Sequence, residues 1–143
     1  MTGKLFTTIL VATDGSEMNR AAIEEALRIG RTCDSVVHVV YVADTSTLET
    51  GPADMMVGNT WDVLPREGEK ALARVRDAAT DVHLETVLLY GKPAEEIVRY
   101  AREKGVDLIV IGSQGKQGIA RLLLGSVAEN VIRTAECRVL VVK

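Results

Sequence analysis

The sequence has 143 residues, which is enough for one domain with a single substantial core and cramped for two. Hydrophobic residues make up 47% and charged residues 26%, proportions that match folded globular proteins and exclude a disordered chain. The 17 basic and 20 acidic residues leave a net charge of -3, and aromatic residues are only 3%, so nucleic acid is not expected as a partner. We expect residues 1–143 to form one domain.

The cysteines and the apolar runs bear on the location of the protein. Cys33 and Cys137 are too few for a disulfide framework and lack the spacing of a zinc site, which favours a reducing compartment. The first apolar run, Ile9–Ala12, is too short for the core of a signal peptide, and the sequence has no run of about 18 apolar residues. We therefore expect a cytoplasmic protein that does not insert into membranes.

Five short runs rich in β-branched residues predict strands. Several of them, such as VVHVVYV and LIVI, are apolar at consecutive positions, which is typical of parallel strands covered on both faces. In chain order the predicted strands are Phe6–Ala12, Val36–Val42, Leu84–Leu89, Asp107–Ile111 and Arg138–Val142.

Helical periodicity fills the intervals between the first three predicted strands. Ser16 is expected to cap the first helix, which ends near Gly30 and has apolar residues at helical spacing. The second helix is predicted from about Pro65 to Thr80. The apolar positions are Met18, Ala22, Ala26 and Ile29 in the first helix, and Leu72, Val75 and Ala79 in the second.

Two further helices complete an alternating pattern of strands and helices. Pro93 is predicted at the first position of the third helix, where its missing N–H costs nothing, with Ile97, Tyr100 and Ala101 facing inward. The sequence from Ser126 to Glu129 fits a capping box that starts the fourth helix. Strict alternation with right-handed crossovers predicts an open parallel five-stranded α/β sheet with helices on both faces.

The segment from Asp44 to Leu64 has no clear period and is longer than most connections between a strand and a helix. Segments of this length are usually lids, binding loops or partly disordered stretches.

Candidate chemistry is expected in the loops at the carboxyl ends of the strands, where open α/β sheets bind their ligands. The loop after the first strand reads Thr13-Asp14-Gly15-Ser16, and a glycine-bearing loop from Gly112 to Ser126 follows the fourth strand. Glycines let backbone N–H groups approach an anion, and this loop leads to the positive end of a helix. From Gly112 to Arg138 four basic residues outnumber two acidic ones, which also favours a phosphate ligand.

Two common phosphate-binding motifs do not fit these loops. A Walker A loop fails because Gln117 follows Lys116 and Val110 stands where the first glycine belongs. The dinucleotide-binding motif G-x-G-x-x-G fails because the loop after the first strand holds only Gly15.

The pattern that does match is G-x2-G-x9-G-[ST], formed by Gly112, Gly115, Gly125 and Ser126. With it the chain resembles the ATP-binding branch of the universal stress protein family. The similarity covers essentially the whole chain, through the segments ILVATDGS, YVAD, DLIVIGSQG, LLLGSVAENVI and VLVV, and through Gly91 and Pro93 before the third helix.

The resemblance implies a Rossmann-like sheet of strand order 3-2-1-4-5 and a homodimer formed through the last strand. It further implies ATP, with Mg or Mn on the phosphates, bound across the carboxyl ends of the first and fourth strands. Asp14, next to Thr13, would contact the ribose, the backbone of Val42 the adenine, and Gly112 the ribose and α-phosphate. The residues lining the phosphates would be Gly115, Gly125, Ser126 and Val127, with Lys116 as a candidate γ-phosphate contact.

Simpler roles remain open for several of these residues. Asp14 fits an Asx turn that starts a helix, and Ser126 fits a helix cap. Lys116 is equally consistent with a solvated surface lysine. His38 and His83 have no partner pattern, so we expect neither a metal-binding nor a catalytic role for them.

Three alternatives stand beside a nucleotide-dependent regulator that reports to a protein partner. A slow ATPase or phosphotransferase would use the same site, but Asp44 is the only acid near the loops besides Asp14. A phosphoacceptor receiver domain is rejected because Tyr90-Gly91 follows the third strand where an acceptor Asp is required. A flavodoxin-like electron carrier is not expected, because the loop after the first strand of this chain lacks a hydroxyl-rich phosphate cradle and the loops after the second and third strands offer no aromatic sandwich for the flavin ring.

Overall fold

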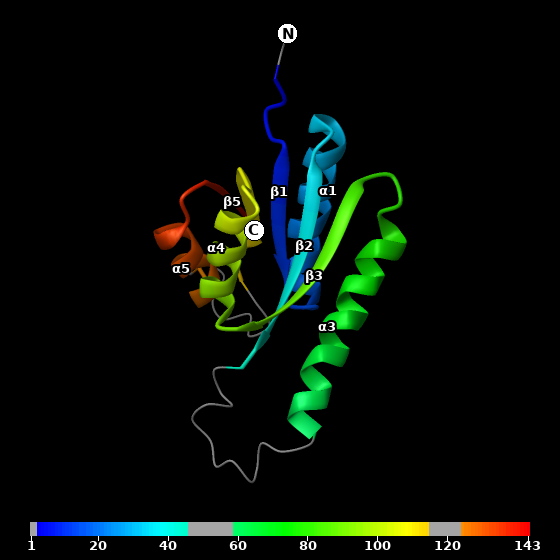
Figure 1. Ribbon diagram of the computed structural model, residues 1–143, viewed down its shortest axis with the longest axis vertical. Coiled ribbons are helices and arrows are strands. Elements are labelled where there is room, and N and C mark those ends of the chain that lie inside the picture. Colours follow the sequence, from blue (N-terminus) through cyan, green and yellow to red (C-terminus); the bar gives the residue numbers. More distant parts are fainter. Residues whose placement is uncertain (1–2, 46–58, 115–123) are drawn as a thin grey trace.

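The computed structural model describes residues 3–45, 59–114 and 124–143, except for the side chains of residues 59–64. Five parallel strands form one sheet in the predicted order β3-β2-β1-β4-β5 (Figure 1). The strands are β1 (Thr8–Thr13), β2 (Val36–Asp44), β3 (His83–Gly91), β4 (Leu108–Gly112) and β5 (Arg138–Val142).

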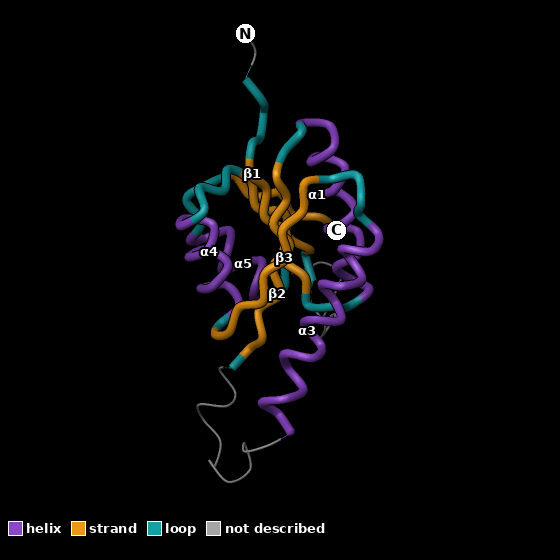
Figure 2. Tube along the Cα trace, turned by 45° about the vertical axis from the view of Figure 1, so that its right-hand side comes forward, coloured by secondary structure: helices purple, strands orange, loops and turns teal. Residues whose placement is uncertain are grey.

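Helices cover both faces of the sheet, as the consecutive apolar runs predicted (Figure 2). Because side chains alternate along a strand, Val37 and Val39 of β2 pack toward α1 and α3, while Val40 packs toward α4 and α5. The helical elements are the 3-10 turn η1 (Glu17–Asn19), α1 (Arg20–Cys33), α3 (Asn59–Ala78), α4 (Pro93–Glu103) and α5 (Ser126–Thr134).

Two predicted helix starts were wrong. α3 begins at Asn59, and Pro65 lies inside it instead of opening it. The N-cap of α5 is Gly125, which makes no side-chain cap, and Glu129 pairs with Arg133 at 2.7 Å instead of forming a capping box. By contrast, Pro93 does open α4 as predicted.

The first helical segment also starts differently from the sequence pattern. Ser16 precedes the 3-10 turn η1, so Met18 belongs to that turn and its side chain is 45% exposed. The apolar face of α1 begins with Ala22, which is fully buried. Ser16 stands at the N-cap of η1, but its hydroxyl makes no capping hydrogen bond.

α3 packs closely against the sheet at Gly68. A Cβ built on Gly68 would lie 2.6 Å from Cδ1 of Leu88 and 2.7 Å from Cδ1 of Tyr41. The absence of a side chain therefore sets the distance between α3 and strands β2 and β3. Among the described residues, no helix is long and apolar enough to span a membrane.

Candidate functional site

The candidate site begins where β1 and β4 end side by side. Their register pairs Val11 with Val110, so Thr13 and Asp14 at the end of β1 lie near Gly112 at the end of β4. Thr13 and Gly112 are buried, and Asp14 is half-buried. The parallel pairing therefore brings together three of the residues that the sequence predicted for one site.

The loop after β1 is held by short hydrogen bonds around Asp14. Oδ1 of Asp14 accepts from the backbone N–H of Ser16 at 2.9 Å and from its hydroxyl at 2.5 Å, which is the Asx turn weighed from the sequence. Gly15 has a φ of 81°, and its N–H donates to the Thr13 hydroxyl at 3.1 Å. Among the described residues, Oδ2 of Asp14 receives no hydrogen bond, so this oxygen is available to a ligand.

Asn19 joins this loop to the chain beyond β4, and the sequence analysis missed it. Its Oδ1 accepts from the Asp14 N–H at 2.7 Å, and its Nδ2 donates to the Gln114 carbonyl at 3.4 Å. The two bonded positions belong to loops that are far apart in the chain, so no local pattern pointed to this contact. The only available signal was an amide residue close after Asp14 in the predicted loop.

The loop after β4 is fastened at both of its described ends. The Ser113 N–H donates to the Val142 carbonyl at 2.8 Å, and the Gly125 N–H donates to the Ser113 carbonyl at 2.6 Å. Because the Gly125 N–H is engaged, the phosphate donors that α5 can offer are the N–H groups of its first turn, starting at Ser126 and Val127. Gly115 and Lys116 lie outside the described residues.

A pocket of about 510 Å³ opens between α4 and α5. Its volume falls in the range of about 300–1,000 Å³ that is usual for small-molecule sites. It brings Ser126 and Val127 together with Asp44, the last residue of β2, and with Lys92 at the N-cap of α4. Val42, the predicted adenine contact, lies one residue beyond the last pair between β1 and β2, which joins Thr13 to Tyr41.

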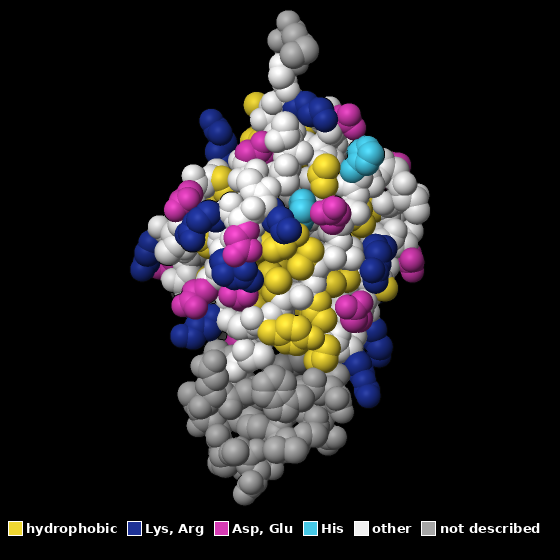
Figure 3. Space-filling view, viewed as in Figure 1, with side chains coloured by type: hydrophobic (Ala, Val, Ile, Leu, Met, Phe, Trp, Pro, Cys, Tyr) yellow, Lys and Arg dark blue, Asp and Glu magenta, His cyan; other side chains and the backbone are white. Residues whose placement is uncertain are grey.

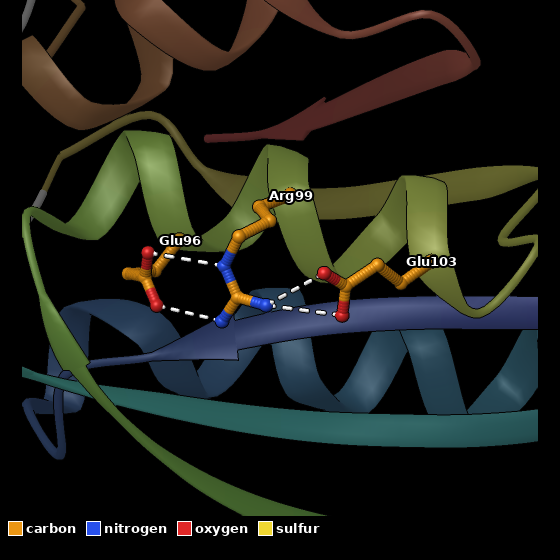
Figure 4. Close-up of polar contacts among 3 residues, drawn as sticks. All are labelled: Glu96, Arg99 and Glu103. Carbon is orange, nitrogen blue, oxygen red and sulfur yellow. Dashed lines mark hydrogen bonds and ion pairs between the residues drawn. The ribbon is translucent and has the colours of Figure 1, made fainter.

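The arginines that line the pocket are already paired. Arg99 donates to Glu96 at 2.7 and 3.2 Å and to Glu103 at 2.9 and 3.0 Å (Figure 4), which raises the pKa of the guanidinium. Arg102 lies 3.5 Å from Glu136. Among the described residues, Lys92 is therefore the lining cation without an ion pair. Figure 3 shows basic and acidic side chains intermingled over α4, with hydrophobic side chains gathered beside them over the sheet.

Comparison with known proteins places this arrangement in a family. The sequence profile of the universal stress protein family matches residues 5–143. The chain belongs to the universal stress protein family. Universal stress protein MJ0531 of Methanocaldococcus jannaschii is 43% identical to it over 141 residues, which are 97% of this chain and 83% of that protein. Universal stress protein YxiE of Bacillus subtilis is 31% identical over 97% of this chain and 100% of its own length.

Solved structures of the family share the fold. UspA from Lactobacillus plantarum superposes with a TM-score of 0.84 at 30% identity, covering 96% of this chain and 97% of that one. A universal stress protein from Archaeoglobus fulgidus in complex with dAMP has a TM-score of 0.66 at 25% identity, covering 97% and 99%. Another universal stress protein, in complex with cAMP, has a TM-score of 0.68 at 26% identity, covering 96% of both chains.

The described residues of this universal stress protein contain no cluster of three or more His, Cys, Asp or Glu side chains that could hold a metal ion. Asp14 supplies one free carboxylate oxygen at the end of β1.

His38 of the universal stress protein is buried away from the site. Its Nδ1 lies 2.7 Å from the hydroxyl of Tyr100 and 3.4 Å from Oε2 of Glu85, and Lys104 lies over the Tyr100 ring. Burial lowers the pKa of His38, which Glu85 partly opposes and Lys104 reinforces. These contacts tie β2 to α4 and β3, and give His38 a structural role.

Proposed function

We propose that this universal stress protein binds ATP across the carboxyl ends of β1 and β4 and acts as a nucleotide-dependent regulator. The observation that carries the proposal is the fastening of two loops to each other. Asn19 bonds to Asp14 and to Gln114, and Gly125 bonds to Ser113. A carboxylate suited to a ribose and the N-terminus of a helix suited to phosphate are thereby held at one end of the sheet.

The roles of the residues follow from the groups they offer. Oδ2 of Asp14 would accept a hydrogen bond from a ribose hydroxyl, and the first-turn N–H groups at Ser126 and Val127 would bind phosphate oxygens. The backbone of Val42 would meet the adenine. Gly115 and Lys116 belong to the proposal through the family pattern alone.

Related proteins support the ligand class. Two members of the family were solved with adenine nucleotides, one with dAMP and one with cAMP. Both ligands contain an adenine, a sugar and a phosphate, which match the three kinds of group proposed here. We propose ATP, with Mg or Mn on its phosphates, as the ligand of this chain.

The proposal can be tested at a single backbone N–H. Ser126 is the first residue of α5, and Gly125 before it has a φ of −64° and a ψ of 158°, an extended conformation that a following proline accepts. Ser126→Pro therefore removes one phosphate donor and leaves the helix able to form. Ser126→Ala is the matched control, because it keeps the N–H and removes only the hydroxyl.

We expect calorimetry to show that Ser126→Pro weakens ATP binding by about tenfold, as expected for one charge-assisted hydrogen bond, while adenosine binding stays close to wild type. Mass spectrometry of nucleotide released from the denatured wild type would identify the bound species. Equal ATP affinities in Ser126→Pro and Ser126→Ala would refute phosphate binding at this helix.

We also propose a homodimer formed through β5. Among the described residues, β5 pairs with β4 alone, and its residues Val139–Val142 are partly exposed. An apolar edge strand invites pairing with another chain, and a two-fold contact closes after two copies. Light scattering should show a dimer for the wild type and a monomer for Leu140→Lys. A monomeric wild type at micromolar concentration would contradict the proposal.

A slow ATPase is the second candidate, favoured by one observation. Asp44 lines the same pocket as Ser126 and Val127, so this pocket holds an acidic residue as well as the proposed phosphate donors. If Asp44 assists hydrolysis, Asp44→Asn should lower turnover at saturating magnesium without weakening ATP binding. Unchanged turnover would remove Asp44 from consideration.

A further inference from the structure

Asn19 occupies a position where asparagine usually has a different task. It is the N-cap of α1, and asparagine is among the preferred residues there because its side chain bonds to the first turn of the helix. In this chain Asn19 makes no such bond, and its residue is only 6% exposed. The side chain is therefore turned into the protein and used elsewhere.

The amide of Asn19 faces one donor and one acceptor from two different loops. Its Oδ1 accepts from the N–H of Asp14 at 2.7 Å, and its Nδ2 donates to the carbonyl of Gln114 at 3.4 Å. Only one orientation of the amide satisfies both partners, since an N–H needs an oxygen and a carbonyl needs an N–H. Asn19 thus fixes the end of β1 relative to the chain beyond β4.

The loop after β1 also has hydrogen bonds that do not involve Asn19. Ser16 holds Oδ1 of Asp14 through its N–H and hydroxyl, and Thr13 accepts from the N–H of Gly15. What Asn19 adds is the connection to the other loop. Gly112 leaves room for it, because a Cβ there would lie 2.9 Å from Nδ2 of Asn19.

We infer that Asn19 is a positioning residue that sets the distance between the ribose-binding and the phosphate-binding halves of the nucleotide site. This inference rests on the proposed ATP binding. In this inference Asn19 does not touch the ligand; its two hydrogen bonds hold the two loops in place relative to each other. A ligand that contacts only the loop after β1 gains little from this bridge, whereas a ligand that contacts both loops depends on it.

The test compares ATP with adenosine, which lacks the phosphates. Calorimetry would measure the affinity of both ligands for the wild type, Asn19→Ala and Asn19→Ser. The serine variant is included because serine is a good helix N-cap residue, so it can replace the alanine variant if that one folds poorly. Thr32→Ala is the matched control, because Thr32 also bonds a backbone carbonyl from α1, at 2.9 Å, but at the far end of the helix. Amide hydrogen exchange at Asp14 would report the bridge without any ligand.

We expect both Asn19 variants to weaken ATP binding about tenfold and adenosine binding less than about twofold, given the net value of one or two hydrogen bonds. Exchange at the Asp14 amide should be faster in them, and Thr32→Ala should match the wild type in all three measurements. If the wild type binds ATP but the Asn19 variants keep the same ratio of ATP affinity to adenosine affinity, the inference is overturned. The proposed function would not be affected by that result. A wild type that binds neither ligand would overturn the proposed function itself.

Discussion

Replacing Asp14 by asparagine should separate its two roles. Oδ1 of Asp14 accepts two hydrogen bonds from Ser16, at 2.9 and 2.5 Å, whereas Oδ2 is the oxygen proposed for the ribose. Asparagine keeps an oxygen for Ser16 and supports the same turn, but it replaces the second oxygen and the charge by an NH₂ group. The fold should therefore survive the change that removes the ribose acceptor.

The expected magnitudes differ for stability and binding. We expect Asp14→Asn to lower the free energy of unfolding by about 0.5–1.5 kcal/mol, because the bonds to Ser16 persist without the charge. ATP binding should lose about 1.5–3 kcal/mol, or roughly 10- to 150-fold in affinity, since a hydrogen bond to a charged group is lost. Binding therefore suffers more than folding.

The assay is a cycle of two proteins and two nucleotides. Calorimetry would measure ATP and 2′,3′-dideoxy-ATP on the wild type and on Asp14→Asn, with urea unfolding measured alongside. Asp107→Asn is the control, because Asp107 accepts from the N–H and hydroxyl of Thr7, at 2.9 and 2.8 Å, at the opposite end of β1. If the wild type prefers ATP over the dideoxy nucleotide by the same factor as Asp14→Asn does, Asp14 does not bind the ribose.

Three further predictions concern stability. Burial lowers the pKa of His38, so the unfolded chain binds a proton more readily; the contribution of His38 to stability should be constant above about pH 6.5 and fall below it. Urea unfolding between pH 5 and 8 should show a weaker pH dependence in His38→Gln than in the wild type, and an equal pH dependence would contradict this assignment. Gly112→Ala should lower the free energy of unfolding by about 1–3 kcal/mol, because the added Cβ clashes with Asn19, and by less when Asn19 is also replaced by alanine. If the losses of the two single variants simply add in the double variant, that clash is ruled out. Gly68→Ala should destabilise by about 1–3 kcal/mol although alanine favours helices, and a stabilised variant would show that α3 can move away from the sheet.

The sheet was predictable because its signals are local. Consecutive apolar residues predicted strands covered on both faces, and β5 begins and ends at the predicted residues, Arg138–Val142. The start of α3 was missed because Pro65 favours a first helical position, whereas the helix extends to Asn59. A proline within a helix depends on surrounding structure that a local pattern does not contain.

The site was predictable only in part, for a related reason. Asp14 and Gly112 end strands that adjoin in the sheet, so the strand order alone brings them together. Asn19 is hydrogen-bonded to Gln114, which lies 95 positions away in the sequence, and a contact at such a distance produces no local sequence pattern. The sequence predicted that Ser126 caps α5, but the N-cap is Gly125, whose backbone is extended, and Ser126 is the first residue of the helix.

The hydrogen bond between Gly125 and Ser113 has a consequence for how this protein can change. It closes the chain between these two residues at its base, at 2.6 Å, and Ser113 is itself bonded to the last residue of β5. The entropy cost of closing such a segment rises slowly with length, by only about 0.6 kcal/mol for each doubling. We therefore expect insertions between Ser113 and Gly125 to change the stability of the sheet little. Because both anchoring hydrogen bonds join backbone groups, the length and side chains of this segment can vary while the two anchors are kept.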